Sequence, residues 1–147
     1  MNIDRMEIEK VVRQVLAQQI GEQKTTSPDG LIMVDIPSWE VSEDDRMDTG
    51  NPRDRVYTKD FFDLDESSRL GAGLMTMKES TFDWTLHYDE VDYVIEGSLS
   101  VIGSRGKVTA TPGQLILIPK ESKIKFSAPQ SARFIYITYP ADWESQK

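Results

Sequence analysis

The feature that most constrains the fold is a series of short apolar runs, which begins near residue 31 and continues almost to the end of the chain. Turn-forming residues separate these runs, and no second helical pattern interrupts them. In one separator, the segment Thr111–Gln114, Pro112 and Gly113 occupy the central positions of a predicted type II turn. This rhythm is typical of an all-β sandwich or a small barrel. The predicted strands are Leu31–Ile36, Arg55–Phe61, Ala72–Lys78, Phe82–Tyr88, Val91–Ile95, Leu99–Ile102, Val108–Thr111, Gln114–Ile118, Lys123–Ser127 and Phe134–Tyr139.

The composition excludes several kinds of site. The chain has no cysteine, which removes disulfides and thiolate metal sites, and His87 is its only histidine, so a two-histidine zinc motif cannot form. The formal charge of -8 argues against nucleic acid and against an anionic membrane as partners. No apolar run approaches the roughly 20 residues that span a bilayer, and the N-terminus lacks the apolar core of a secretory signal. We therefore expect a soluble protein of the bacterial cytoplasm.

The first 20 residues read as an amphipathic helix. Asp4 followed by Glu7 is the pattern of a capping box, and Gly21 is a natural helix stop. The next segment, residues 21–30, has the composition of a linker, and we expect the β domain to occupy residues 31–147. The apolar stripe of the helix, at i, i+3 and i+4 spacing, consists of Ile8, Val11, Val12, Val15, Leu16 and Ile20.

Two stretches of the β region resemble the motifs of the cupin family. Residues 82–97, FDWTLHYDEVDYVIEG, contain Glu90 followed after six residues by Gly97, which is the spacing of the first cupin motif. A later stretch resembles the start of the second cupin motif. It consists of Pro112-Gly113, the apolar strand Gln114–Ile118 and Pro119. The resemblance implies an all-β cupin domain, a small jelly roll or β-barrel, which the amphipathic helix and the linker precede.

Most of the metal ligands that the cupin motifs usually supply are missing. The resemblance places the two histidines of the first motif at Trp84 and Leu86, and that of the second motif at Ile124. Only the carboxylate, Glu90, remains, and since transition-metal sites need three or four converging ligands, we expect no tightly bound transition metal. By strand alternation His87 faces away from residues 84 and 86. It is either a surface histidine or, if a bulge rotates the strand, a side chain that turns into the pocket.

A narrower resemblance covers residues 31–143. It is carried by Trp84-Thr85-Leu86, Tyr88-Asp89-Glu90, Ile118-Pro119-Lys120 and the terminal YPADW of Tyr139–Trp143, which are similar to the EutQ family of ethanolamine-utilisation cupins. The resemblance implies a role in ethanolamine catabolism inside a bacterial microcompartment and an acetate kinase activity, for which ATP and Mg²⁺ would be the cofactors. Because small cupins frequently pair, we also expect a homodimer.

The N-terminal helix has three open interpretations. Its stripe resembles the encapsulation peptides of microcompartment cargo, which would bind a shell protein as a helix in a groove. The alternatives are that it packs on its own barrel or on a dimer mate, or that it lies on a membrane surface. Lys10 and Arg13 are the only clearly placed basic residues on its polar face, which weakens the last interpretation.

The predicted site lies in the barrel. Strand alternation puts Asp92 on the same face as Glu90, and two enclosed carboxyl groups raise the pKa of at least one of them and suit acid–base chemistry. We expect Glu90, Asp92 and Tyr88 to be catalytic, and the pocket to be lined by Trp84, Leu86, Tyr93 and Ile124. The phosphate-binding candidates are Lys59, Lys120 and Lys123. The alternatives are that the lysines are solvated surface residues, that Asp92 solvates a strand end, and that Tyr88 and Tyr93 are core or rim aromatics.

Three functions remain open from the sequence. If the protein is an acetate kinase, it should show nucleotide-dependent turnover, and substitution of Glu90 should lower that turnover. A metal-free pocket that binds a small metabolite predicts stabilisation by a ligand without turnover. An assembly protein predicts that removal of residues 1–20 abolishes localisation and leaves the barrel folded.

Overall fold

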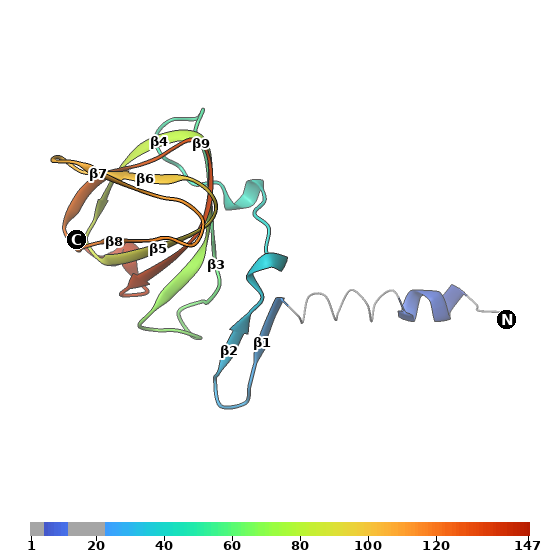
Figure 1. The fold of residues 1–147 in the computed structure, drawn as a ribbon. Helices are drawn as coiled ribbons and strands as arrows, with labels where there is room; N and C mark the ends of the chain where they lie inside the picture. Colours follow the sequence, from blue (N-terminus) through green and yellow to red (C-terminus); the bar gives the residue numbers. More distant parts are fainter. Residues whose placement is uncertain (1–4, 12–22) are drawn as a thin grey trace. The chain divides into compact units, whose positions relative to one another are not determined.

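The computed structural model of the chain describes residues 5–11 and 23–147. The chain divides into two units, residues 1–40 and residues 41–147, which are described separately. No helix in these described stretches is long and apolar enough to cross a membrane. Figure 1 shows the course of the chain, with the strands of the second unit wrapped around a common interior.

In the first unit, residues 5–11 are helical, and the side chains of Ile8 and Val11 are exposed. The remaining predicted stripe residues, Val12, Val15, Leu16 and Ile20, lie outside the described residues. Within the expected linker, residues Lys24–Thr26 form strand β1, which pairs antiparallel with β2, Ile32–Val34. The intervening Ser-Pro-Asp-Gly sequence consists of residues that favour turns. This part of the expected linker therefore closes a hairpin instead of forming a flexible linker. A single 3₁₀ turn, η1 (Ile36–Ser38), follows.

The second unit is the predicted all-β barrel. After a 3₁₀ turn, η2 (Glu43–Asp45), its strands are β3 (Arg55–Asp60), β4 (Gly71–Leu86), β5 (Asp89–Gly97), β6 (Leu99–Ile102), β7 (Lys107–Ala110), β8 (Leu115–Ile118) and β9 (Ser122–Tyr139), and η3 (Trp143–Ser145) lies near the end of the chain. The strand order is β3-β4-β9-β5-β8, with β6 paired to both β9 and β7. All neighbouring strands are antiparallel, which confirms the all-β architecture predicted from the spacing of the turns.

Two pairs of predicted strands are each one long strand. The expected runs 72–78 and 82–88 are joined in β4, and the runs 123–127 and 134–139 are joined in β9. The two long strands stay paired along their whole length and change register between Lys78 and Ser80, where Glu79 adopts a positive φ of 47°. A bulge of this kind bends a strand without ending it, so the polar residues that suggested a turn mark a bend.

The predicted type II turn is confirmed, and the glycine of the first motif also needs a conformation that favours glycine. Gly113 has a φ of 89°, and the amide of Gln114 donates to the carbonyl oxygen of Thr111 at 3.0 Å, as a type II turn requires. Gly97, the glycine of the first motif, has a φ of 78°, and a Cβ there would run into the carbonyl oxygen of Ser131 on β9. Both conditions favour glycine over any other residue.

The core fills the interior of the barrel. Inward-facing residues alternate with outward-facing ones along β5, where Glu90, Asp92 and Val94 are buried and Tyr93 between them is exposed. Most of the interior is apolar, and the cluster consists of Val56, Met75, Met77, Phe82, Leu86, Tyr88, Val94, Leu99, Val101, Ala110, Ile116, Ile118, Phe126, Ala128, Ala132, Phe134 and Tyr136. Glu90 and Asp92 are therefore carboxyl groups on the wall of a hydrophobic core.

Candidate functional site

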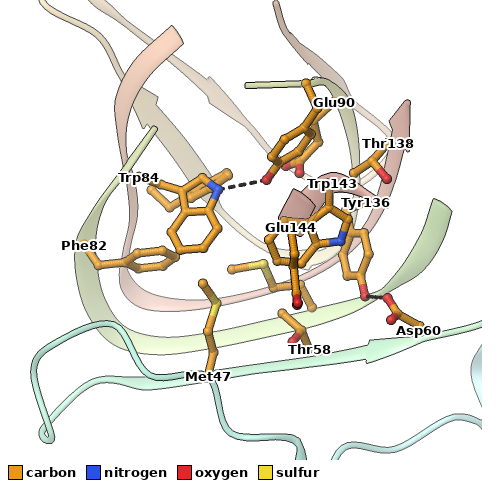
Figure 2. A pocket seen from close by; sticks show the side chains of 13 residues that line it. Met47, Thr58, Asp60, Phe82, Trp84, Glu90, Tyr136, Thr138, Trp143 and Glu144 are labelled. Carbon is orange, nitrogen blue, oxygen red and sulfur yellow. Dashed lines mark hydrogen bonds between the residues drawn. The ribbon is translucent and has the colours of Figure 1, made fainter. Parts of the chain in front are cut away.

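A pocket opens into the barrel beside Glu90. It is a small cavity of about 100 Å³, and its wall is built from β3, β4, β5, β9 and η3 (Figure 2). About 10–15 Å³ on this measure holds one water molecule, so the cavity has room for a small organic molecule. It is smaller than the roughly 300–1,000 Å³ of pockets that enclose larger ligands such as nucleotides. The lining residues are Met47, Thr58, Asp60, Met75, Phe82, Trp84, Tyr88, Glu90, Phe126, Tyr136, Thr138, Trp143 and Glu144.

The buried carboxyl pair lies at the inner end of this pocket. Glu90 is 6% exposed and Asp92 is completely buried. No protein N–H or O–H group from the described residues reaches either carboxylate oxygen of Asp92. Glu90 and Asp92 are two residues apart on β5, so their side chains lie on the same face of the strand. Two ionised carboxylates repel each other, whereas a protonated carboxyl group can donate a hydrogen bond to an ionised one.

Burial controls the titration of this pair. Removal from water disfavours a charged carboxylate and raises the pKa of Glu90 to about 7. The pKa of Asp92 is also raised, first by burial and then by the neighbouring charge of Glu90. Near neutral pH Glu90 is therefore poised to take up or release a proton.

Aromatic side chains form one wall of the pocket. The indole Nε1 of Trp84 donates to the hydroxyl oxygen of Tyr88 at 2.8 Å, which leaves the hydroxyl hydrogen of Tyr88 available to another acceptor (Figure 2). Trp143 of η3 packs against both rings, with ring centroids 5.9 Å from Trp84 and 5.5 Å from Tyr88. Burial and the nearby Glu90 charge raise the pKa of Tyr88 far above its usual value, so this hydroxyl stays protonated. The C-terminal 3₁₀ turn thus completes the aromatic wall.

The opposite side of the pocket carries a second tyrosine. The hydroxyl of Tyr136 on β9 donates to Asp60 Oδ1 on β3 at 2.6 Å, a bond drawn in Figure 2. Gly73 on β4 lies between these strands, and a Cβ at that position would collide with the Tyr136 ring and hydroxyl and with the carbonyl oxygen of Lys59. The absence of a side chain at residue 73 is what lets the ring of Tyr136 lie flat against the sheet and reach Asp60.

Thr138 contributes a hydroxyl group without a partner. Its side chain is 2% exposed, lines the pocket, and lies directly opposite Glu90 in the β5–β9 ladder. Its Oγ1 has no hydrogen-bond partner among the described residues. A buried hydroxyl that makes no hydrogen bond costs free energy, so Thr138 and Glu90 together present polar groups that a ligand could satisfy.

The structure brings together part of the predicted site. Glu90, Tyr88 and Trp84 line the pocket, and Asp92 lies behind Glu90 on the same strand face. Three predicted lining residues do not line it. Leu86 is fully buried in the core, Ile124 packs on the edge of that core, and Tyr93 points outward with 42% of its surface exposed. For Tyr93 the reason is strand alternation, because it stands between the inward residues Asp92 and Val94.

The predicted phosphate-binding lysines lie elsewhere. Lys59 stands between Thr58 and Asp60 on β3 and so faces away from the pocket, while Lys120 and Lys123 are exposed. The backbone amide of Lys120 donates to Asp89 Oδ1 at 2.9 Å. No lysine, arginine or histidine is found among the described residues that line the pocket. The chemistry of this pocket is therefore acidic and aromatic.

His87 is a surface residue. Its Nδ1 lies 3.0 Å from Glu121 Oε2, and its side chain is 39% exposed. It does not line the barrel pocket, so the alternative in which it turns inward beside Glu90 is not what the structure shows. In the stretches that the structure describes, no group of three or more His, Cys, Asp or Glu residues is placed to hold a metal ion.

Several residues that line the pocket were not predicted from the sequence. Asp60, Tyr136, Thr138 and Glu144 lie far apart in the chain and come together only when β3, β9 and η3 meet. One usable signal was present, because the alternation along β9 places Tyr136 and Thr138 on the same face. Which face is inward depends on the pairing with β5, which the sequence does not show.

The barrel has the fold of a cupin. The structure is similar to a cupin superfamily protein from Desulfitobacterium hafniense DCB-2, with a TM-score of 0.55 and 12% identity, covering 71% of this chain and 85% of that one. At this identity the similarity concerns the fold alone.

The chain belongs to the EutQ family. The sequence model of the family described as "Ethanolamine utilisation protein EutQ" matches residues 3–145. A solved structure of the Clostridium difficile EutQ protein has a TM-score of 0.82 and 60% identity, covering 84% of this chain and 90% of that one. The chain is thus an ethanolamine-utilisation protein by family, as the narrower resemblance implied.

Two relatives of this chain are named for an enzyme activity. A Clostridioides difficile (strain 630) protein named "Acetate kinase EutQ" is 56% identical over 99% of this chain and 97% of its own length. A Salmonella typhimurium protein of the same name is 33% identical over 94% of this chain. The present chain spans only 61% of that second relative.

Proposed function

We propose that this chain is an acetate kinase of ethanolamine utilisation, which transfers a phosphoryl group between ATP and acetate. The observation that carries the proposal is the similarity to the Clostridioides difficile relative of that name, which extends over nearly the whole of both chains. The phosphoryl acceptor would be the carboxylate oxygen of acetate, and the bond broken would be that between the terminal phosphorus of ATP and its bridging oxygen.

The pocket supports the small substrate better than the nucleotide. A cavity of about 100 Å³ accommodates a two-carbon acid, whereas the nucleotide would have to lie outside it. The hydroxyl groups of Tyr88 and Thr138 can each donate a hydrogen bond to an acetate oxygen. Because the pKa of Glu90 is about 7, its carboxyl group is partly protonated near neutral pH and can donate as well.

Positive charge would have to come with the nucleotide. Phosphoryl transfer requires cations or backbone amides around the transferred group, and the described lining residues of the pocket include no basic side chain. Mg²⁺ usually binds one or two carboxylates together with substrate phosphates. Asp60 and Glu144 are carboxylates of the lining and could hold such an ion, which would neutralise charge on the phosphates.

The direct test is acetyl phosphate formation from acetate and Mg-ATP by the purified protein. We expect turnover by the wild type and at least a tenfold loss in Glu90→Gln, because the variant keeps the size of the side chain and removes its titratable proton. Glu121→Gln is the matched control, since Glu121 contacts His87 on the surface. Absence of turnover in the wild type, or equal turnover in Glu90→Gln, would overturn the proposal.

We further propose that the N-terminal segment, residues 1–20, recruits the protein to a microcompartment shell protein. Two of its predicted anchors, Ile8 and Val11, are exposed on the helical residues 5–11, as a helix that binds in a groove of another protein requires. Full-length protein with Ile8→Glu and Val11→Glu should lose co-localisation with the shell, whereas Glu9→Gln on the polar face should keep it. Retention of the double variant in the shell would refute this role.

We propose in addition that the chain forms a homodimer through the outer face of β5, β8 and β9. Strand register brings exposed apolar side chains together there, with Leu115 opposite Tyr93 and Leu117 opposite Val91, which in turn pairs with Ile137. Leu115, Leu117 and Ile137 are 62%, 66% and 41% exposed. A contiguous apolar sheet face of this kind is uncommon on a monomer, and one patch that meets its own copy satisfies twofold symmetry.

A further inference from the structure

At alkaline pH, where Glu90 is ionised, the barrel pocket favours a cation over an anion. Three of its lining residues, Asp60, Glu90 and Glu144, are acidic, and no basic side chain is present among the described lining. A second, larger pocket shares Asp60, Trp143 and Glu144 with it. This second pocket adds three further acids, Asp63, Asp65 and Asp142. The summed field of these carboxylates attracts cations towards the opening of the barrel.

The inner wall is suited to an organic cation. Trp84, Tyr88, Tyr136 and Trp143 line the cavity, and the faces of such rings attract ammonium groups, most strongly where water is excluded. Glu90 lies among these rings and is 6% exposed, so that its carboxylate would form a charge-assisted hydrogen bond with an ammonium ligand. Aromatic rings around a buried carboxylate are the chemistry that recognises an alkylammonium ion.

A second polar group defines the other end of the ligand. The Thr138 hydroxyl is buried, lines the same cavity and has no hydrogen-bond partner in the described part of the chain. It lies directly opposite Glu90 across the β5–β9 ladder, where paired side chains start about 5 Å apart. A ligand that carries an ammonium group and a hydroxyl group on a two-carbon chain could reach both. The cavity of about 100 Å³ has room for a ligand of that size.

We propose that the barrel pocket binds a small amino alcohol, of which ethanolamine is the simplest, with its ammonium group on Glu90 between the aromatic rings and its hydroxyl group on Thr138. This inference does not require the kinase activity. It adds a cationic ligand to the pocket in which we place acetate, so the amino alcohol would compete with acetate there.

The test is binding to the full-length protein at about pH 8 without nucleotide, measured by calorimetry with four probes of nearly equal size. Ethanolamine should bind, ethylammonium should bind more weakly because it lacks the hydroxyl group, and ethylene glycol and glycolate should not bind at the same concentrations. Glu90 is ionised at this pH while a primary ammonium group keeps its proton. Equal binding of ethylene glycol and ethanolamine would overturn the proposal, as would the absence of any ethanolamine binding.

Two variants separate the two ends of the ligand. Glu90→Gln should lower the affinity for ethanolamine by about tenfold or more. Thr138→Val keeps the shape of the side chain and should weaken ethanolamine a few-fold while leaving ethylammonium unchanged. The surface variant Glu121→Gln should bind like the wild type, and circular dichroism confirms that each variant is folded. Unchanged ethanolamine affinity in a folded Glu90→Gln protein would refute the site.

The outcome is independent of the kinase assay. Ethanolamine binding together with absent acetyl phosphate formation would uphold this inference and remove the proposed enzyme activity. Kinase turnover without ethanolamine binding, and without inhibition by ethanolamine at limiting acetate, would uphold the kinase activity and overturn this inference.

Discussion

Asp92 lies behind Glu90 on the inward face of β5, and its two carboxylate oxygens receive no hydrogen bond from an N–H or O–H donor in the described part of the chain. Two ionised carboxylates on the same buried strand face repel each other, which favours protonation of one of them. Both residues are buried, so the protein carries a titratable group in its core, and both stability and ligand binding become dependent on pH.

The first prediction concerns the pH dependence of stability. The pKa of Glu90 is about 7 in the folded protein against an ordinary value of 4.5 for a glutamate, so between these values the folded state binds more protons than the unfolded state. The stabilising contribution is complete below about pH 4.5 and is lost as the pH rises through 7. The free energy of unfolding should fall by about 3 kcal/mol over this interval.

Urea denaturation at a series of pH values measures this effect. The profile of Glu90→Gln should be flatter than that of the wild type, because the amide does not titrate. Glu121→Gln should retain the wild-type slope, since Glu121 is exposed. Parallel profiles for the wild type and Glu90→Gln would show that Glu90 titrates normally.

The second prediction is that Asp92→Asn stabilises the protein at about pH 8. The amide removes a buried charge and supplies an N–H donor to Glu90, so we expect a gain of roughly 1–3 kcal/mol in the free energy of unfolding. Asp89→Asn on the same strand is the control, because Asp89 is exposed and already accepts a hydrogen bond from the Lys120 amide. A loss of stability in Asp92→Asn would mean that Asp92 is paired in a way that the structure does not show.

The third prediction tests the close approach at Gly73. A methyl group there would collide with the ring and hydroxyl of Tyr136 and with a backbone oxygen, so Gly73→Ala should cost about 2 kcal/mol or more. Gly106→Ala meets nothing within 4 Å and should change stability by no more than about 0.5 kcal/mol. Thermal unfolding of both variants provides the comparison. Equal melting temperatures would show that the sheet relaxes around residue 73 at no cost.

The fourth prediction concerns the aromatic wall. Trp143→Ala removes ring contacts with Trp84 and Tyr88, and we expect a loss of about 1–2 kcal/mol in stability together with a wider pocket. Glu144→Ala in the same 3₁₀ turn should be nearly neutral, because Glu144 is exposed. Denaturant titrations monitored by circular dichroism would distinguish the two. A neutral Trp143→Ala would mean that η3 does not pack on the barrel in solution.

The fifth prediction addresses the proposed homodimer. Leu117→Lys places a charge at the most exposed apolar position of the β5, β8 and β9 face, and it should convert a dimer into a monomer. Leu70→Lys is the control, because Leu70 is also exposed but precedes β4 and lies outside that face. Sedimentation analysis gives the oligomeric state directly. A monomeric wild-type protein would exclude the interface.

The all-β architecture and the placement of the two carboxyl groups on one strand face could be predicted from local sequence patterns. Turn chemistry at regular intervals set an all-β barrel, and the period of two along a strand was enough to place Glu90 and Asp92 on one face. These features are local, because each depends on residues only a few positions apart. The same alternation of side chains, applied strictly, would have placed the Tyr93 side chain on the outer face of the strand.

The composition of the pocket depends on contacts between segments that are far apart in the chain. Asp60 meets Tyr136 across 76 positions of sequence, and Trp143 closes the wall over Trp84 from the end of the chain. The expected lysines point away because the faces of β3 and β9 are fixed by their neighbours. The bend at Glu79 likewise depends on continued pairing with β9, which turned two expected strands into one. Contacts between distant segments follow from strand pairing and close packing, which no local pattern specifies.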